Sequence, residues 1–273
     1  MVPTENIRAF ILDMDGVIYL GKTPRPGSAD FLARLRQSET PFLFLTNNTV
    51  RTSEQYVALL DEIGLDPQAV PEQFITSAQV TALWLRRNLP PESSVFVIGE
   101  SALRTVLARK GFVLVGSDAA QVDAVEIDAV VVSMDHAFDY EKLKSAALAI
   151  RGGALFVGTN PDVTHPTPRG LFPGTGSILA AVEAASGAPP LVMGKPHSPA
   201  FEEALRRLGH PAANTIMIGD RLETDIAGGK EAGLLTGLVL GGASSKDDLA
   251  QSPIKPDFLF RDMEHLGRWF RRR

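Results

Sequence analysis

Cysteine is absent from this 273-residue chain. Its absence excludes disulfides, thiolate metal sites and every mechanism with a cysteine nucleophile. No apolar run approaches the roughly 18 residues of a membrane span, and the amino terminus lacks the charged head and apolar stretch of a signal peptide. We therefore expect a cytoplasmic protein with no membrane partner. A basic excess is also lacking, because the net charge is −5 and the pI is about 5.6, which argues against a nucleic-acid partner.

The residues that are present suit a globular protein with a large core, since 44% of them are hydrophobic. Short apolar runs alternate with amphipathic segments, and this pattern predicts an α/β protein with a mostly parallel sheet. The expected strands are residues 7–12, 41–45, 95–99, 129–134, 154–158, 191–194, 215–219, 235–240 and 258–260. The expected helices are residues 28–38, 53–64, 101–111, 140–153 and 199–209.

The polar signatures of the chain fall into two blocks, residues 13–48 and 195–225. The long segment between them carries its own series of strands and helices, which indicates a second domain inserted between two halves of a site. We expect a catalytic core of residues 1–82 and 187–273. Residues 83–186 are expected to form an inserted α/β cap that acts as a lid and sets substrate specificity.

One stretch matches two different motifs. The segment Gly16–Thr23 reads G-V-I-Y-L-G-K-T, which fits the G-x-x-x-x-G-K-[ST] phosphate loop of nucleotide-binding enzymes. Its interior is β-branched and aromatic, however, and Lys22-Thr23 is followed by two prolines instead of a helix. We therefore reject the phosphate loop and predict a hairpin after the first strand.

Charged and polar side chains follow four of the expected strands. They are Asp13 and Asp15, then Thr46, Asn47 and Asn48, then Lys195, and finally Asp220 and Asp225. The carboxyl edge of a parallel sheet is where ligands bind in open α/β folds. The hydroxyl and amide groups can hold phosphate oxygens, and the four carboxylates suit a hard cation. Gathered together, these carboxylates would repel each other unless Mg²⁺ and Lys195 offset their charge.

The motifs D-M-D-G-V, T-N-N, G-K-P and G-D-x-x-x-T-D, in this order, resemble those of the haloacid dehalogenase superfamily of phosphatases. The pairs G-T-N-x-D (158–162) and P-G-T-G (173–176) resemble the NagD-like or 4-nitrophenylphosphatase branch, which is related to phosphoglycolate and pyridoxal phosphate phosphatases. The resemblance covers nearly the whole chain. It implies a Rossmann-like core with a large α/β cap inserted after the second motif.

The resemblance also implies the roles of the site residues. Asp13 would be the nucleophile and would form an aspartyl-phosphate, and Asp15 would be the general acid and base. Lys195 would orient the nucleophile, while Thr46 and Asn47 would contact the phosphate.

The resemblance further implies a Mg²⁺ cofactor. The ion would be held by Asp13, the backbone carbonyl of Asp15 and Asp220, and Asp225 would support this shell. The expected activity is therefore Mg²⁺-dependent hydrolysis of small phosphomonoesters.

Specificity is expected to lie in the Gly- and Pro-rich stretch 158–176, which faces the leaving group in the resembling family. His165 matches a substrate-contacting histidine of the pyridoxal phosphate branch, with an ordinary loop histidine as the alternative. We expect a small phosphorylated metabolite as substrate. Nucleoside monophosphates, sugar phosphates, phosphoglycolate and pyridoxal phosphate all stay open, and a homodimer through the cap is a further possibility that the resemblance raises.

Three other functions compete with this hypothesis. A dehalogenase on the same fold needs neither the second aspartate of D-x-D nor a metal, so Asp15 and Asp220 count against it. A phosphotransferase or phosphomutase would need the cap to retain a sugar phosphate. A non-catalytic sensor of phosphorylated ligands could lose Asp13 or Asp15 without penalty, yet both are present.

Overall fold

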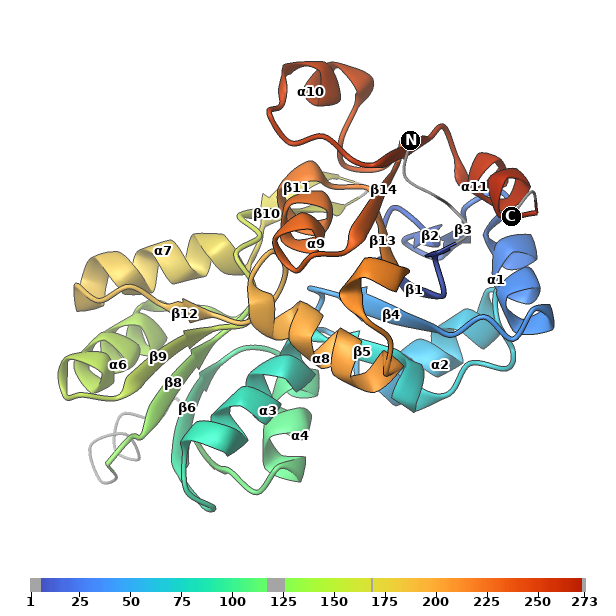
Figure 1. Ribbon diagram of the computed structural model, residues 1–273. Helices are drawn as coiled ribbons and strands as arrows, with labels where there is room; N and C mark the ends of the chain where they lie inside the picture. Colours follow the sequence, from blue (N-terminus) through green and yellow to red (C-terminus); the bar gives the residue numbers. More distant parts are fainter. Residues whose placement is uncertain (1–5, 117–125, 168, 272–273) are drawn as a thin grey trace. The chain divides into compact units, whose positions relative to one another are not determined.

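The computed structural model describes residues 6–116, 126–167 and 169–271. The chain forms two compact units. Unit 1 consists of residues 1–46, 53–75 and 195–273, and unit 2 consists of residues 47–52 and 76–194. Each unit is built on a parallel sheet, which confirms the predicted α/β class with mostly parallel strands (Figure 1).

Unit 1 contains a six-stranded sheet in the order β15-β14-β13-β1-β4-β5. The strands are β1 (Ala9–Leu12), β4 (Phe42–Thr46), β5 (Phe74–Thr76), β13 (Thr215–Gly219), β14 (Leu235–Val239) and β15 (Phe258–Phe260). The central strand β1 is entirely buried and pairs in parallel with β13 on one side and β4 on the other. A strand that is covered on both faces reads as a continuous apolar run, which is why the sequence shows no alternation here.

Helices cover both faces of this sheet. One face packs against α1 (Ser28–Gln37), α2 (Ser53–Glu62) and α11 (Met263–Phe270), and its core includes Phe10, Leu12, Phe31 and Tyr56. The opposite face contacts α8 (Ser198–Leu208) and α9 (Ala227–Glu231). A short hairpin of β2 (Tyr19–Leu20) and β3 (Thr23–Pro24) follows β1, as predicted, and α10 (Lys246–Gln251) follows β14.

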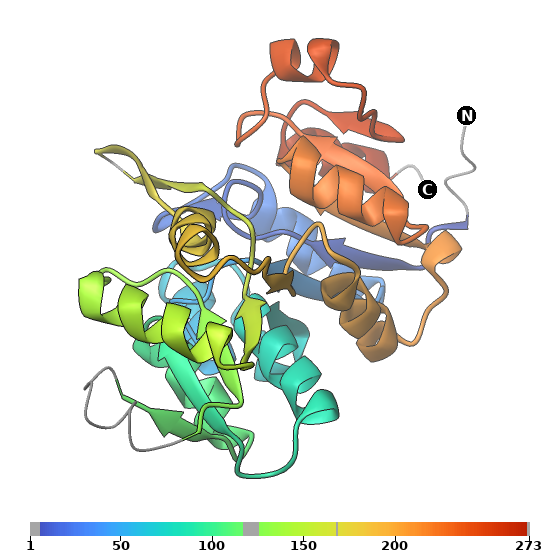
Figure 2. The ribbon, with the colours of Figure 1, turned by 90° about the vertical axis from the view of Figure 1, so that its left-hand side faces the viewer.

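Unit 2 contains a five-stranded sheet in the order β12-β9-β8-β6-β7. The strands are β6 (Ser94–Ile98), β7 (Val113–Val115), β8 (Ala129–Val132), β9 (Leu155–Gly158) and β12 (Leu191–Val192). The helices α6 (Tyr140–Arg151) and α7 (Thr175–Ser186) pack together on one face, and α3 (Ser77–Asn88) packs against α4 (Ser101–Arg109). An antiparallel hairpin of β10 (Thr164–Thr167) and β11 (Gly170–Pro173) lies beside α7 (Figures 1 and 2).

All nine expected strands and all five expected helices are present, with ends shifted by a few residues. The bounds of the two units differ from the expected division at 82/83 and 186/187. Residue 82 lies inside α3, a helix that begins after Thr76, whose hydroxyl accepts a hydrogen bond from the Gln79 N–H. The contacts place the boundaries at 75/76 and 194/195, and they also assign residues 47–52 to unit 2. The role of unit 2 as a specificity cap stays a prediction.

Within the described parts of the chain, none of the helices has both the length and the apolar character that crossing a membrane requires.

Candidate active site

The pairing of β1 with β13 brings two of the expected aspartates side by side. Leu12 is in register with Ile218, and the backbone N–H of Asp13 donates to the Ile218 carbonyl at 2.8 Å. Each strand therefore ends at the same edge of the sheet, with Asp13 directly after β1 and Asp220 directly after β13. Both side chains are buried. Their burial requires compensating charge or hydrogen bonds.

Lys195 provides part of that charge. Its ammonium donates to Asp13 Oδ1 at 2.5 Å and to Asp225 Oδ1 at 2.6 Å, and the lysine side chain is only 3% exposed. Asp225 belongs to a turn of π-helix, η4 (Leu222–Ile226), that follows β13. Its second oxygen, Oδ2, accepts the backbone N–H groups of Asp220 at 3.2 Å and Arg221 at 3.1 Å. Asp225 therefore anchors the lysine and orders the chain around Asp220.

The electrostatics of this cluster are dominated by burial. Burial raises the pKa of Asp13 well above its usual value; the Lys195 ammonium lowers it only in part, and the charges of Asp225 and Asp220 raise it further. The pKa of Asp220 is raised to about 6, by burial first and by Asp225 second. Burial disfavours the charged form of Lys195, but attraction to Asp13 and Asp225 outweighs it and raises the lysine pKa. Lys195 alone therefore does not supply enough positive charge to balance the buried carboxylates.

A divalent cation fits this deficit. Asp13, Asp220 and Asp225 each offer a carboxylate oxygen, and these three atoms lie within 4.8 Å of one another. Three carboxylates against one ammonium leave a formal charge of −2 in a buried place, which a hard divalent ion would neutralise. Because Asp225 also receives Lys195 and two N–H groups, Asp13 and Asp220 are the better candidates for direct ligands. Their role as metal ligands stays a prediction.

Two further predicted site residues, Asp15 and Thr46, lie on segments adjoining β1: Asp15 comes two positions after Asp13, and Thr46 ends the neighbouring strand β4. Asp15 is half-buried and forms an isolated β-bridge with Tyr19 at the start of the hairpin, and its side chain is not one of the three clustered carboxylates. Thr46 is the buried last residue of β4, which pairs with β1. Their roles as acid–base and phosphate ligand stay predictions.

Asn47 and Asn48 belong to the short segment of the chain assigned to unit 2. The Asn47 side-chain amide donates to Asp162 Oδ2 at 3.1 Å, and its carbonyl accepts from Asn160 at 2.9 Å. Asn48 Oδ1 accepts the Val50 N–H at 2.9 Å, which is the geometry of a turn-forming asparagine. The structure thus gives Asn48 a local structural bond, and phosphate binding by either residue stays a prediction.

His165 lies on β10, in the Gly- and Pro-rich stretch 158–176, part of which forms the hairpin of β10 and β11. Its ring packs edge-on against Phe172 and His136, with centroids 6.0 and 6.4 Å away. Its Nδ1 is buried and has no hydrogen-bond partner among the residues that the structure describes. Contact with substrate stays a prediction for this residue.

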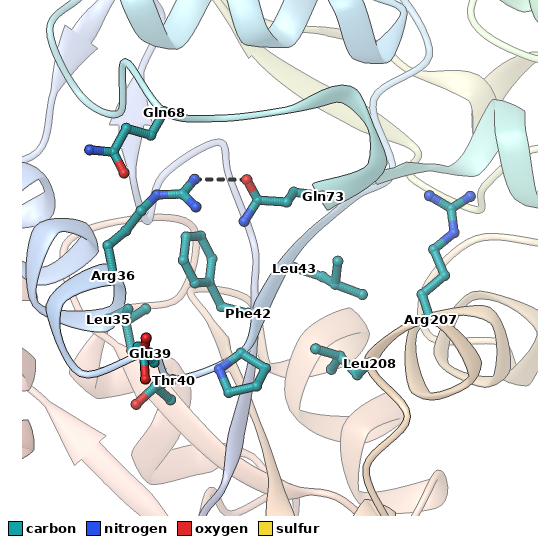
Figure 3. Close-up of a pocket in the computed structure, with 11 residues that line it drawn as sticks. Leu35, Arg36, Glu39, Thr40, Phe42, Leu43, Gln68, Gln73, Arg207 and Leu208 are labelled. Carbon is teal, nitrogen blue, oxygen red and sulfur yellow. Dashed lines mark hydrogen bonds between the residues drawn. The ribbon is translucent and has the colours of Figure 1, made fainter.

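Unit 1 also has a surface pocket of about 470 Å³ (Figure 3). It lies at the amino end of β4, where Pro41, Phe42 and Leu43 form part of its wall. Arg36 borders it, bonded to Asp66 and Gln73. None of the clustered carboxylates lines this pocket, so we do not assign the chemistry to it.

Comparison with known proteins gives the family. A model described as haloacid dehalogenase-like hydrolase matches residues 10–113, and one described as HAD-hydrolase-like matches residues 192–266. An acid sugar phosphatase of Staphylococcus aureus is 36% identical over 95% of this chain and 96% of its own.

Solved structures are similar as well. A 4-nitrophenylphosphatase of Thermotoga maritima is 34% identical, with a TM-score of 0.88 over 97% of this chain and 98% of its own. NagD of E. coli K-12 is 32% identical, with a TM-score of 0.83 over 94% and 97%. A glycerol phosphate phosphatase of Mycobacterium tuberculosis in complex with magnesium is 36% identical, with a TM-score of 0.85 over 96% and 77%.

Fold, site and comparisons together define an enzyme of the phosphatase class. The chain belongs to the haloacid dehalogenase-like hydrolase family, and within it to the NagD type, which confirms the family expected from the motifs. The glycerol phosphate phosphatase of Mycobacterium tuberculosis was solved in complex with calcium as well as with magnesium, and both complexes support a divalent metal.

Sequence reasoning missed one loop that contacts the site. The N–H of Ala243 donates to Asp220 Oδ2 at 2.7 Å. The available signal was the Gly241-Gly242 pair after the expected strand 235–240, which indicates a close approach of backbone to another group.

Proposed function

We propose that this protein is a Mg²⁺-dependent phosphatase that hydrolyses small phosphomonoesters through an aspartyl-phosphate on Asp13. The observation that carries the proposal is the bonding of Asp13. Its Oδ1 is held by Lys195, whereas its Oδ2 accepts no hydrogen bond from any residue that the structure describes. One oxygen is thus fixed by a cation and the other is available to attack phosphorus.

Phosphate monoester hydrolysis is among the slowest uncatalysed reactions, so the enzyme must stabilise a large charge. Mg²⁺ bound by Asp13 and Asp220 would supply neutralisation of the phosphoryl oxygens and of the nucleophile. Lys195 holds the attacking carboxylate in one orientation and lowers its repulsion from a phosphate dianion. Asp225 keeps the lysine in place through a hydrogen bond of 2.6 Å.

In the first displacement, Asp13 Oδ2 forms a bond to phosphorus and the bond from phosphorus to the leaving oxygen breaks. Asp15 donates its proton to that oxygen, so an alcohol leaves. In the second displacement, Asp15 takes a proton from water, the water oxygen attacks phosphorus, and the Asp13 carboxylate is released with inorganic phosphate. Asp15 must therefore arrive protonated while Asp13 is ionised.

The names of similar proteins support a proposal for the class of substrate. Their names include acid sugar, 4-nitrophenyl and glycerol phosphate phosphatases, which share a phosphomonoester of a small alcohol or phenol. We propose a small polyol or sugar phosphate as substrate, with unit 2 acting as the specificity cap. A homodimer through unit 2 stays a prediction.

The test is release of inorganic phosphate from 4-nitrophenyl phosphate and from a panel of phosphorylated metabolites, with Mg²⁺ and with EDTA. We expect activity with Mg²⁺, no activity with EDTA, and no activity for Asp13→Asn. Asp15→Ala should impair alkyl phosphates more than 4-nitrophenyl phosphate, because a good leaving group needs no proton. Binding of phosphorylated ligands without turnover would support a sensor, and transfer of phosphate to a second sugar phosphate would support a mutase.

A further inference from the structure

The proposed metal ligand Asp220 is enclosed by a short loop, residues 241–244, which we call the strap. The Ala243 N–H donates to Asp220 Oδ2 at 2.7 Å, and the Ser244 N–H donates to the Asp220 carbonyl at 2.9 Å. The Ser244 hydroxyl in turn accepts the Leu222 N–H at 3.0 Å. The strap therefore fixes both the side chain and the main chain of Asp220.

The backbones of two glycines lie very close to the Asp220 carboxylate. A Cβ atom at Gly242, within the strap, would lie 2.0 Å from Asp220 Oδ2, and a Cβ at Gly16 would lie equally close. No side chain fits in either place without displacing the carboxylate, because real Cβ contacts do not approach so closely. Asp220 is thus held between the backbone of the strap and the backbone that follows Asp15.

Arg25 ties the strap to the segment that carries Asp13. Its Nη2 donates to the Gly241 carbonyl at 2.9 Å, and its own backbone N–H donates to the Ile18 carbonyl at 3.0 Å. Ile18 lies in the turn between Asp15 and β2. Gly241 adopts a φ of +88°, and a Cβ there would lie 2.7 Å from the same guanidinium nitrogen. The arginine therefore fastens the first residue of the strap onto the hairpin.

We propose that Arg25 and the strap are a positioning device that holds Asp220 in place for the cation, so that Arg25 sets the affinity for Mg²⁺. The inference rests on the proposed function, because it concerns the metal of that site. Arg25 acts through the Gly241 carbonyl and Asp220, and it has no role in the proton transfers. Releasing the strap would leave Asp220 with more conformational freedom to lose when the ion binds.

The experiment is calorimetric titration of Mg²⁺ into the wild-type protein and into Arg25→Ala, Arg25→Lys and Arg8→Ala. Arg8 is an exposed arginine of the same unit whose side chain makes no hydrogen bond within the described residues, so it controls for the loss of one positive charge. We expect Arg25→Ala to weaken Mg²⁺ binding about tenfold, which corresponds to about 1.4 kcal/mol. Arg25→Lys should recover part of the affinity, since an ammonium can still donate to a carbonyl, and Arg8→Ala should bind as the wild type does.

Kinetics and melting give independent readouts. The Mg²⁺ concentration for half-maximal activity should rise in Arg25→Ala by a larger factor than kcat falls. Thermal melting in EDTA shows whether each variant is folded, and the rise in Tm that Mg²⁺ causes should be smaller in Arg25→Ala than in Arg8→Ala. If Arg25→Ala does not fold, Arg25→Lys alone tests the proposal. It should bind Mg²⁺ more weakly than the wild type, because a flexible ammonium does not reproduce the planar donor geometry of the guanidinium.

Equal Mg²⁺ affinity in the wild type and both Arg25 variants would overturn the strap proposal while leaving the phosphatase proposal standing. Hydrolysis of phosphate esters by the wild-type protein, with Mg²⁺ and not without it, would support the proposed function whatever the Arg25 variants show. Absence of both Mg²⁺ binding and activity in the wild type would overturn the proposed function, and the strap proposal with it.

Discussion

Replacing Lys195 by methionine is the most informative perturbation of the site. Methionine keeps much of the apolar stem and removes only the ammonium, so the effect reports charge and hydrogen bonding. In the native cluster Lys195 bonds Asp13 at 2.5 Å and Asp225 at 2.6 Å. Without it, the formal charge of the cluster changes from −2, for three carboxylates and one ammonium, to −3.

The size of the effect follows from burial. Lys195 is 3% exposed and Asp225 is 1% exposed, so water replaces little of the lost interaction. Removing one partner of a buried ion pair typically costs about 3–5 kcal/mol, and we expect Lys195→Met to lower the free energy of unfolding by that amount in EDTA near neutral pH. The pKa of Asp13, already raised by burial, would rise further. A carboxyl group with a raised folded pKa is destabilising above its unfolded pKa, so the loss should grow as pH rises from about 4.

Urea unfolding at several pH values measures this free energy, and Lys22→Met is the matched control. Lys22 also pairs with a glutamate, Glu62, at 2.8 Å, but the two side chains are 66% and 59% exposed. Such a pair contributes at most about 1 kcal/mol, so the control should change stability little. Equal stability of the two variants, or a loss that shrinks with rising pH, would refute the electrostatic account of the cluster.

Three further predictions concern other positions. Gly16→Ala should lower Tm and weaken Mg²⁺ binding, because Gly16 has a φ of +88° and a Cβ would lie 2.0 Å from Asp220 Oδ2; wild-type values of both would contradict the geometry. Glu203 is 3% exposed, and although burial opposes its charge, hydrogen bonds from Arg206 and Arg207 lower its pKa to about 2. Glu203 should therefore contribute up to roughly 3 kcal/mol to the free energy of unfolding, fully present above pH 4.5 and lost as pH falls toward 2. In urea titrations, Glu203→Gln should remove this part of the loss of stability at acid pH. His165→Ala should change the ranking of substrates by kcat/KM without abolishing turnover, and an unchanged ranking would remove its role in specificity.

The sequence predicted the centre of the site because strand ends are visible in it. Buried strands appear as continuous apolar runs, and the polar residue that ends each run marks the sheet edge. Asp13, Lys195 and Asp220 were expected at that edge, and the structure places them together. Rejection of the phosphate loop at Gly16–Thr23 is also confirmed, since the segment forms a hairpin and Lys22 bonds Glu62.

Features that depend on contacts between distant segments escaped sequence reasoning. The hairpin of β10 and β11 was obscured by Pro166, Pro168 and Pro173, which break the alternation typical of strands. The strap at 241–244 contacts Asp220 only because β14 lies beside β13, and the sequence does not display this order of strands. The helix α3 was not among the expected helices, and it begins directly after Thr76, the last residue of the short strand β5, so the expected boundary at 82/83 falls inside it.

The covalent role of Asp13 is the central claim, and the stereochemical course at phosphorus tests it most directly. The substrate is a phosphorothioate monoester whose phosphorus is made chiral by sulfur and two oxygen isotopes. It is hydrolysed by the wild-type enzyme with Mg²⁺ in water that carries the third oxygen isotope, so that the thiophosphate product is chiral. Each in-line displacement inverts the configuration at phosphorus. Two displacements, the first by Asp13 and the second by water, predict overall retention. Overall inversion would show that water attacks the substrate directly, and it would contradict the aspartyl-phosphate mechanism.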